Sequence, residues 1–235
     1  MKSFLKGIGI LIFAVVIGTC LGCFSNLWAS TTNPIVVAVI SADSKAQFES
    51  KIEPLLKEQL KNCSTCSVRN ITPYTAEGIF DPGQVPAQIE LARSSSSFFF
   101  LHWNVKVVAE HKPAMEALIK LADSGVIIIA AAGMAKESEA TLPLKQTLAG
   151  QIPGVIIIGE LALNETFPTQ AFFGPEMLTA VKPPKEYIGQ GLGSLFFVSK
   201  LATQWNKRTA PQWVEHFNTT KTKVRRIWPS LNDFF

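Results

Sequence analysis

Short, strongly apolar runs alternate along the chain with longer stretches in which apolar residues recur at helical spacing. The runs are rich in Val, Ile and Phe, which is typical of strands that are buried on both faces. They lie at 35–40, 98–103, 126–133 and 155–159, and 67–72 alternates enough to be a further strand. Helical spacing predicts helices over 44–60 (with Pro54 as a kink or a late start), 85–93 and 113–123, and a glycine-led segment, 187–204, that finishes as a helix.

Strands that alternate with helices predict an α/β fold. A parallel sheet with helices on both faces gives three layers, and its crossover connections should be right-handed. We assign residues 31–223 to this domain, 1–30 to a separate N-terminal segment and 224–235 to a C-terminal aromatic tail. The tail either folds back over the sheet or docks on a partner.

The N-terminal segment has the pattern of an export signal. Lys2 and Lys6 precede an uncharged apolar stretch from Gly7 to Phe24, which is a basic region followed by a hydrophobic region. Three fates remain open for it: lipidation at Cys23, cleavage near residues 29–30, or retention as a membrane anchor. Each predicts an exported protein of the cell envelope, periplasmic or otherwise outside the cytoplasm, that contacts the membrane only through this segment.

Two cysteines, Cys63 and Cys66, lie outside the leader. A redox-active Cys-x-x-C normally sits at a helix N-terminus, where the helix dipole lowers a thiol pKa. Here the pair follows a helical stretch and precedes a strand, which is the opposite end. An oxidising compartment therefore favours a small structural disulfide, and zinc is not expected without a second pair of ligands nearby.

Charge and composition exclude several function classes. The net charge is only +4, with no basic block that could follow a phosphate backbone, so nucleic acid is not an expected partner. The glycine run at 189–193 lacks the Lys-Ser/Thr of a phosphate loop, so no nucleotide is expected. Four glutamates follow the central strands, at the carboxyl edge of the sheet, and we favour a solvent-exposed rim over a cation site for them. These are Glu137, Glu139, Glu160 and Glu165. We predict no metal and no cofactor.

Four segments carry a family resemblance, in this order: SGVIIIAAAGM (124–134), PGVIIIGEL (153–161), FFGPEM (172–177) and GQGLGSLFFVSKLA (189–202). They resemble the second half of a subtilisin-like serine protease, or subtilase. In that family these places hold a strand ending in Ala-Ala-Gly-Asn, a strand near Pro-x-Val-Ile-x-Val-Gly, a Ser-x-x-Gly-Pro turn, and Gly-Thr-Ser-Met-Ala-Ser-Pro opening a helix. The resemblance implies a subtilisin-like fold that is truncated between 42 and 97, where the family's histidine helix and calcium loops would not all fit.

The resemblance also implies that the catalyst is missing. Ser41 follows VAVI (37–40), where the family has its catalytic aspartate, and Asp43 comes two residues later. Met134 stands at the place of the oxyanion-hole asparagine and Gly191 at that of the nucleophilic serine. We therefore predict a non-catalytic subtilase-like protein, a pseudoprotease.

The remaining candidates do not rebuild a catalytic triad. Residues 42–101 contain no histidine, and His102 falls on FFFLHWN (98–104), which resembles a strand of the substrate channel. Ser194 matches the second serine of the family motif, which does not attack substrate, and it would lack a base and an orienting acid. The alternative hypothesis is an active subtilisin-like endopeptidase with a rearranged active site.

A subtilase fold without its catalyst still implies a groove. The family pairs an extended peptide between two channel edges, a mode in which main-chain hydrogen bonds supply affinity. The matching candidates for peptide contact are Leu101, His102, Trp103, Asn104, Ala132 and Gly133. Either this groove binds a peptide or protein partner, or its bulky side chains fill it and the protein is an assembly subunit.

Overall fold

The computed structural model describes residues 33–135, 140–162, 164, 166–188 and 190–223, apart from the side chains of 220–223. The chain divides into Met1–Asn33 and a second unit, Pro34–Phe235. The leader with Cys23 and the aromatic tail 224–235 lie outside the described residues, so the interpretations of both stay predictions. In the part of the chain that is described, no helix is long and apolar enough to cross a membrane.

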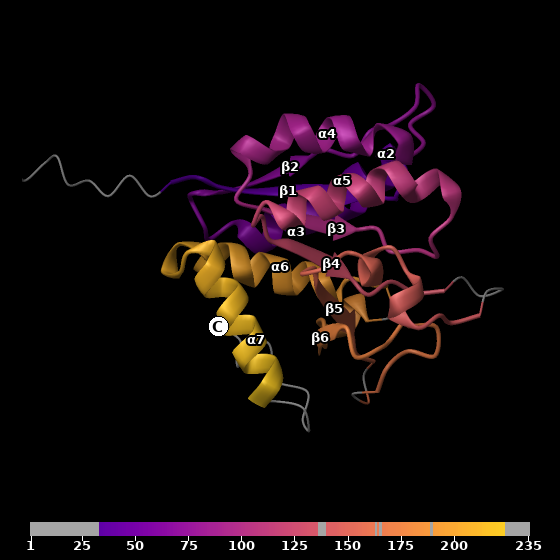
Figure 1. The fold of residues 1–235 in the computed structure, drawn as a ribbon. Helices are drawn as coiled ribbons and strands as arrows, with labels where there is room; N and C mark the ends of the chain where they lie inside the picture. The colour runs from indigo at the N-terminus through magenta and orange to yellow at the C-terminus, as the bar shows by residue number, and fades with distance from the viewer. Residues whose placement is uncertain (1–32, 136–139, 163, 165, 189, 224–235) are drawn as a thin grey trace, which may run out of the picture. The chain divides into compact units, whose positions relative to one another are not determined.

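A parallel sheet forms the centre of the second unit (Figure 1). Among the described residues it has six strands in the order β2-β1-β3-β4-β5-β6, and each neighbouring pair is parallel. The strands are β1 (Ile35–Ser41), β2 (Cys66–Asn70), β3 (Phe98–His102), β4 (Ile128–Ala131), β5 (Ile156–Glu160) and β6 (Met177–Val181). This confirms the predicted α/β fold with a parallel sheet between helical layers.

The helices cover both faces of the sheet. In Figure 1, α4 and α5 lie on one face, and α6 and α7 lie on the other. The α-helices are α2 (Lys45–Gln47), α3 (Glu53–Leu60), α4 (Val85–Ala92), α5 (Lys112–Asp123), α6 (Gly193–Gln204) and α7 (Ala210–Lys223). Short 3₁₀ helices are η2 (Pro82–Gln84), η3 (Arg93–Ser95), η4 (Ala109–His111), η5 (Leu144–Gln146), η6 (Ala149–Gln151), η7 (Lys185–Tyr187) and η8 (Trp205–Lys207), and η1 (Phe48–Ile52) is a π-helix.

Side-chain alternation in β3 divides the core in two. Phe98 and Phe100 pack with α3, α6 and α7 on one face, whereas Phe99 and Leu101 pack with α4 and α5 on the other. All four side chains are fully buried, and burying each stabilises the fold by about 1.5–3 kcal/mol. This continuous apolar run is typical of a strand with helices on both sides.

Pro54 has a local effect on the first helical segment. It lies in the first turn of α3, which directly continues α2 and η1, so its missing N–H interrupts the hydrogen-bond ladder of this helical segment. The π-helix η1 directly precedes it, and the Glu53 N–H donates to the Phe48 carbonyl five residues earlier. The expected irregularity at Pro54 is therefore a π-turn within a continuous helical segment.

The sequence pattern did not predict β6. Its five residues, MLTAV, lie at the edge of the sheet and are buried except for Leu178, and the segment directly before it resembles a turn. β4 is also shorter than predicted, because the chain leaves the sheet at Ala132 and reaches Gly133 with a φ of +83°. Such a φ favours glycine and ends the strand.

Candidate functional site

The direction in which successive strands are added to the sheet reverses between β1 and β3. From β1 the chain passes to β2 on one side, and then returns to β3 on the other side of β1. Open α/β sheets bind ligands outside the carboxyl ends of strands at such a point. Ser41 and His102 are the last residues of these two strands and are partners in the parallel register. This edge is therefore the first place to look for a site.

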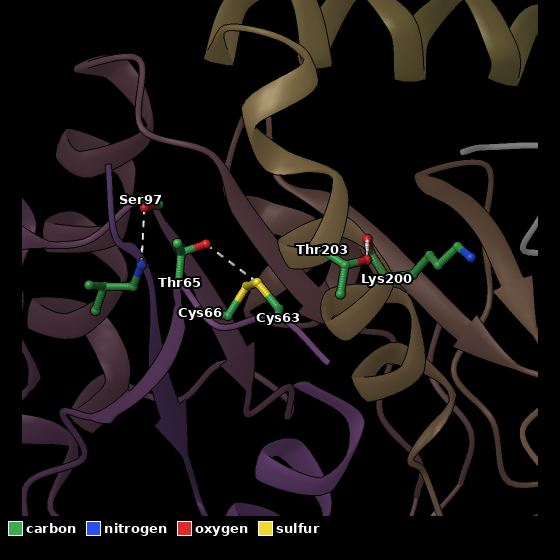
Figure 2. The surroundings of a disulfide bond; sticks show 7 residues. Cys63, Thr65, Cys66, Ser97, Lys200 and Thr203 are labelled. Atoms are coloured by element: carbon green, nitrogen blue, oxygen red, sulfur yellow. Dashed lines mark hydrogen bonds between the residues drawn. A yellow bond between two sulfur atoms is a disulfide. The ribbon is translucent and has the colours of Figure 1, made fainter. Parts of the chain in front are cut away.

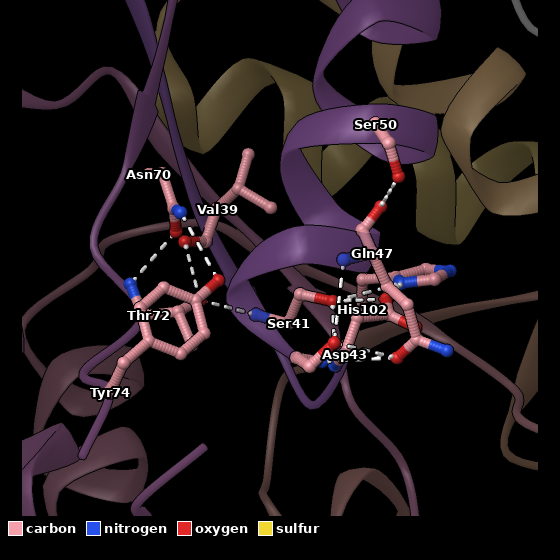
Figure 3. A network of polar contacts seen from close by, with 10 residues as sticks. Val39, Ser41, Asp43, Gln47, Ser50, Asn70, Thr72, Tyr74 and His102 are labelled. Carbon is pink, nitrogen blue, oxygen red and sulfur yellow. Dashed lines mark hydrogen bonds and ion pairs between the residues drawn. The ribbon is translucent and has the colours of Figure 1, made fainter. Parts of the chain in front are cut away.

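Three polar side chains converge there, as Figure 3 shows. The Ser41 hydroxyl donates to Asp43 Oδ2 at 2.5 Å. His102 Nδ1 lies 3.2 Å from Asp43 Oδ2 and 3.3 Å from Ser41 Oγ. Since the Ser41 proton points to Asp43, Nδ1 faces two acceptors. This arrangement favours the tautomer with the proton on Nδ1 and leaves Nε2 with its lone pair.

The cluster resembles a catalytic dyad more than a triad. Asp43 orients the His102 ring as the acid of a triad does, and the hydrogen bond from His102 lowers the Asp43 pKa below its ordinary value although burial opposes the shift. A nucleophilic serine would have to contact the opposite ring nitrogen, Nε2. Ser41 contacts the same nitrogen as Asp43 and is fully buried. The geometry therefore holds an oriented imidazole without an activated serine.

Hydrogen bonds from the segment after β2 fix the end of β1. The Ser41 N–H donates to Thr72 Oγ1 at 2.7 Å, and the Thr72 N–H donates to Asn70 Oδ1 at 3.0 Å. Asn70 also donates to the Tyr74 hydroxyl at 3.3 Å, and burial raises the Tyr74 pKa. Figure 3 shows these residues on the side of Ser41 away from His102. The backbone that carries Ser41 is thus held by the segment after β2.

Gly191 and Met134, which the sequence resemblance assigns to the family's nucleophile and oxyanion donor, lie side by side. A Cβ built on Gly191 would be 3.8 Å from Met134 Sδ. Gly191 has a φ of +72°, a conformation that residues with a side chain rarely adopt. Neither residue carries a hydroxyl or an amide side chain. The structure therefore brings the two positions together, but without the groups that acyl transfer would need.

Ser194 and Glu160 occupy the start of α6. Ser194 is 2% exposed, and its Oγ has no hydrogen-bond partner among the described residues. The Gly193 N–H donates to Glu160 Oε2 at 2.9 Å, so a buried carboxylate from the end of β5 caps the helix N-terminus, where negative charge is favourable. The expectation of a solvated rim is therefore wrong for Glu160, which is buried because its carboxylate accepts from the start of α6. Glu137, Glu139 and Glu165 lie outside the described residues, and the described ones include no cluster of three or more metal-ligating groups.

Most of the peptide-contact candidates do not line an open groove. Leu101, Trp103, Asn104 and Ala132 are all buried, and only His102 and Gly133 are partly exposed. Asn104 Nδ2 donates to the Ala132 carbonyl at 2.6 Å, and Asn104 Oδ1 accepts from the Ala149 N–H at 2.8 Å. One buried side chain thus links the segments after β3 and β4 to η6.

The segment after β4 is also paired within the chain. Met134 forms an antiparallel bridge with Ala171, the Phe172 N–H donates to the Gly133 carbonyl at 3.1 Å, and the Ala135 N–H donates to the Gln170 carbonyl at 2.8 Å. A Cβ on Gly133 would come within 2.7 Å of the Asn104 carbonyl oxygen. Main-chain groups that could pair with an added peptide strand are therefore already hydrogen-bonded here.

Cys63 lies in the turn after α3 and Cys66 begins β2, and Figure 2 shows the two joined. Their Sγ atoms are 1.98 Å apart, and the Cys66 N–H donates to the Cys63 carbonyl at 3.1 Å. Thr65 Oγ1 lies 3.7 Å from Cys63 Sγ. Both cysteines pack against the core on the α3 and α6 face, which fits a structural link.

Sequence reasoning separated residues that the structure joins. The sequence suggests a displaced acid at Asp43 and a channel residue at His102 that could act as a base, but on its own it does not bring them together, and in the structure they form one cluster. The available signal was that two predicted strands end at polar residues, which meet if the strands are neighbours in a parallel sheet. Asn104 was expected to contact a peptide, and its bridging role had no sequence signal.

Comparison with solved structures supports the fold. A cold adapted subtilisin-like serine proteinase is 11% identical in sequence with a TM-score of 0.55, and the match covers 80% of this chain and 82% of that one. The PatG macrocyclase in complex with peptide is 13% identical with a TM-score of 0.51, over 78% of this chain and 82% of that one. The sequence itself matches no protein-family profile and no curated protein sequence. The resemblance to subtilases is thus confirmed at the level of the fold.

Proposed function

We propose that this protein is a non-catalytic subtilisin-like protein that acts by contact with a peptide or protein partner, or as a subunit of an assembly. The observation that carries the proposal is that Gly191 and Met134 lie next to each other. The position that matches the nucleophile has no side chain, and its neighbour has no oxyanion donor. Loss of one oxyanion-hole donor alone lowers the rate by roughly 10²–10³.

The serines near this edge support the same conclusion. Ser194 is enclosed at the start of α6, so a substrate could not reach its hydroxyl. Ser41 is fully buried, and its proton is directed to Asp43. A serine becomes a strong nucleophile only when a base removes its proton as it attacks. Neither of these serines meets that condition.

The internal hydrogen bonds at this edge favour contact through another surface. The Asn104 bridges and the pairing of Met134 with Ala171 occupy the polar groups that strand addition would use. An extended peptide would have to break these buried hydrogen bonds, each costly to leave unmade. The proposal therefore favours an assembly or partner-binding role outside the former substrate channel.

A second candidate function rests on the Asp43–His102 pair. An active hydrolase with a rearranged site would use His102 Nε2 as a base, and Asp43 already orients the ring. It would still need a nucleophile within reach of Nε2, and no described residue hydrogen-bonds to that atom. The first candidate function therefore has the stronger support.

Location forms part of the proposal. The basic and apolar leader favours export to the cell envelope, with Cys23 as the lipidation candidate. Fractionation of cells that express the native chain should place it outside the cytosol, and the mass of its mature N-terminus distinguishes lipidation, cleavage and retention. Recovery of the full-length chain from the cytosol would contradict export.

Cleavage of quenched fluorescent casein tests the main proposal. The purified full-length protein should give no fluorescence increase above a buffer blank, while an active subtilisin-like protease serves as the positive control. An increase that disappears in Ser194→Ala or Ser41→Ala would restore the hydrolase hypothesis.

A further inference from the structure

A cavity lies between η5 and the segment that leads into β6, away from the His102 cluster and the Asn104 bridge. Its volume is about 560 Å³, within the usual range for binding sites. Phe167, Phe173 and Met177 supply apolar walls. Phe173 is 58% exposed, so part of this wall is in contact with water, and an apolar occupant that covers it is favoured.

The walls of this cavity are fixed by the backbone. The Leu144 N–H donates to the Phe173 carbonyl at 3.0 Å, and Pro143 forms a parallel bridge with Phe173. The Met177 N–H donates to the Gly174 carbonyl at 3.2 Å, and Met177 is part of the core. An occupant therefore meets a largely formed site.

The two charged residues that line the cavity differ in their access to an occupant. Glu176 Oε2 is sealed from solvent against Gly174, where a Cβ would overlap with it, so this oxygen does not face the cavity. Lys145 is exposed and forms no ion pair with any described residue. The walls therefore favour apolar side chains, and Lys145 adds a positive charge at the rim.

The aromatic tail, residues 224–235, follows a helix that packs against the strand bordering the cavity. α7 contacts β6, beside which Figure 1 shows it, and its buried Trp213 and Phe217 lie on the face of the sheet opposite to Met177. Among the described strands none lies beyond β6, so the chain can pass around this edge. The tail has twelve residues, which reach about 40 Å when extended, and neighbouring layers of a fold are only about 10 Å apart. The tail is therefore long enough to enter the cavity.

The sequence of the tail matches the chemistry of the cavity. Phe234 and Phe235 directly follow Asp233, the one acidic residue of the tail, so two aromatic rings and a carboxylate meet apolar walls with Lys145 at the rim. Attachment to α7 gives the tail an effective concentration of the order of millimolar. A separate partner would first have to lose its translational and rotational freedom. Side-chain chemistry and tethering thus both favour the tail over another apolar segment.

We propose that the aromatic tail docks in this cavity of its own chain. Phe234 and Phe235 contact the apolar walls and cover Phe173, and Asp233 pairs with Lys145. This inference goes beyond the proposed function, because it does not depend on the loss of the catalyst. It selects the first of the two fates of the tail, and it removes the cavity from the surfaces that are free to bind a partner.

Photo-crosslinking from the cavity tests the docking in the full-length protein. The photoreactive amino acid p-benzoylphenylalanine replaces Phe173, and an equal mixture of unlabelled and heavy-isotope chains is irradiated, digested and analysed by mass spectrometry. The expected product joins residue 173 to a peptide from the tail, and both halves carry the same isotope. The same amino acid in place of Leu91, which is 67% exposed on α4, is the matched control and should give no product with the tail.

Substitutions in the tail and at the rim assign the product to the proposed contacts. Phe234→Ser together with Phe235→Ser should abolish it. Lys145→Glu should lower its yield by about two- to fivefold, as loss of an exposed ion pair gives, and adding Asp233→Lys should restore the yield. An unchanged yield in Lys145→Glu would overturn the pairing with Asp233.

The remaining outcomes bear on the docking itself. A product whose halves carry different isotopes would overturn the proposal and identify a second copy of the chain as the source of the tail. Absence of a tail product from residue 173, a product that survives both serine substitutions, or an equal yield from residue 91 would also overturn it. None of these outcomes bears on the casein assay, so the two proposals fail separately.

Discussion

Asn104 and Ala132 join the ends of two neighbouring strands through a side-chain hydrogen bond of 2.6 Å. The same Asn104 side chain accepts from the Ala149 N–H at 2.8 Å and is 7% exposed. In a protease with this fold an extended peptide needs unpaired main-chain groups beside the channel strands. Here the Asn104 amide takes one of those groups, the Ala132 carbonyl. The relation between Asn104 and Ala132 therefore links the stability of this edge to its proposed loss of substrate binding.

Removal of the Asn104 amide should destabilise the domain. Asn104→Ala leaves the Ala132 carbonyl and the Ala149 N–H buried without partners, so we expect the free energy of unfolding to fall by about 2–3 kcal/mol. Urea denaturation measures the change. Asn164→Ala is a matched control, because Asn164 is exposed and its hydrogen bonds within the described residues are to nearby Thr166. It should shift the free energy of unfolding by less than about 0.5 kcal/mol. An equal effect of the two substitutions would contradict the bridging role.

The Asp43–His102 pair should make stability depend on acid pH. The folded-state pKa of Asp43 is lowered, chiefly by the His102 hydrogen bond, so folding favours the ionised carboxylate. Its contribution is fully present above the ordinary aspartate pKa of about 4 and is lost as the pH falls through the folded-state pKa. Because the Asp43 side chain is 32% exposed, we expect only about 1 kcal/mol.

Denaturation at pH 6, 4 and 3 tests this dependence. Asp43→Asn should lose less stability than the parent as the pH falls, and His102→Gln should behave similarly because it removes the partner. Asp123→Asn, an exposed residue at the end of α5, should follow the parent. Parallel curves for Asp43→Asn and the parent would show that the pair does not stabilise the folded state.

Cys63 and Cys66 should be oxidised to each other in the native protein. Thiol labelling of the unreduced, denatured protein should modify neither residue. The double substitution to serine should lower the free energy of unfolding by about 2 kcal/mol, as the loop-entropy relation gives for a loop of four residues. The packing of both cysteines against the core supports this direction. Labelling of both thiols would reject the structural disulfide.

The sequence pattern predicted the central strands because β1, β3, β4 and β5 are apolar on both faces. It did not reveal β6, whose five residues, MLTAV, include Thr179 and Ala180 and so lack the continuous run of large apolar residues that marks the central strands, although four of the five are buried. Pattern also does not determine which strands are neighbours. Asp43 and His102 lie 59 residues apart in the chain, and they meet only because β3 pairs with β1 on the side opposite β2.

Whether the groove is open or filled also depends on contacts between residues that are far apart in the chain. The bulk of His102 and Trp103 raised the hypothesis of a filled channel, but neither residue makes the bridge. Asn104 does so, because its amide reaches the Ala132 carbonyl and the Ala149 N–H at once. These groups lie 28 and 45 residues from Asn104 in the chain. A local sequence pattern does not reveal contacts between residues so far apart.

Reaction with a fluorophosphonate probe tests the central claim most directly, because the probe bonds covalently to an activated serine whatever the substrate preference. The purified full-length protein should remain unlabelled, since Gly191 offers no hydroxyl and both Ser41 and Ser194 are buried. An active subtilisin-like protease, labelled in parallel, shows that the probe is competent. Labelling that is lost in Ser41→Ala or Ser194→Ala, with the fold intact, would contradict the account and identify the active serine.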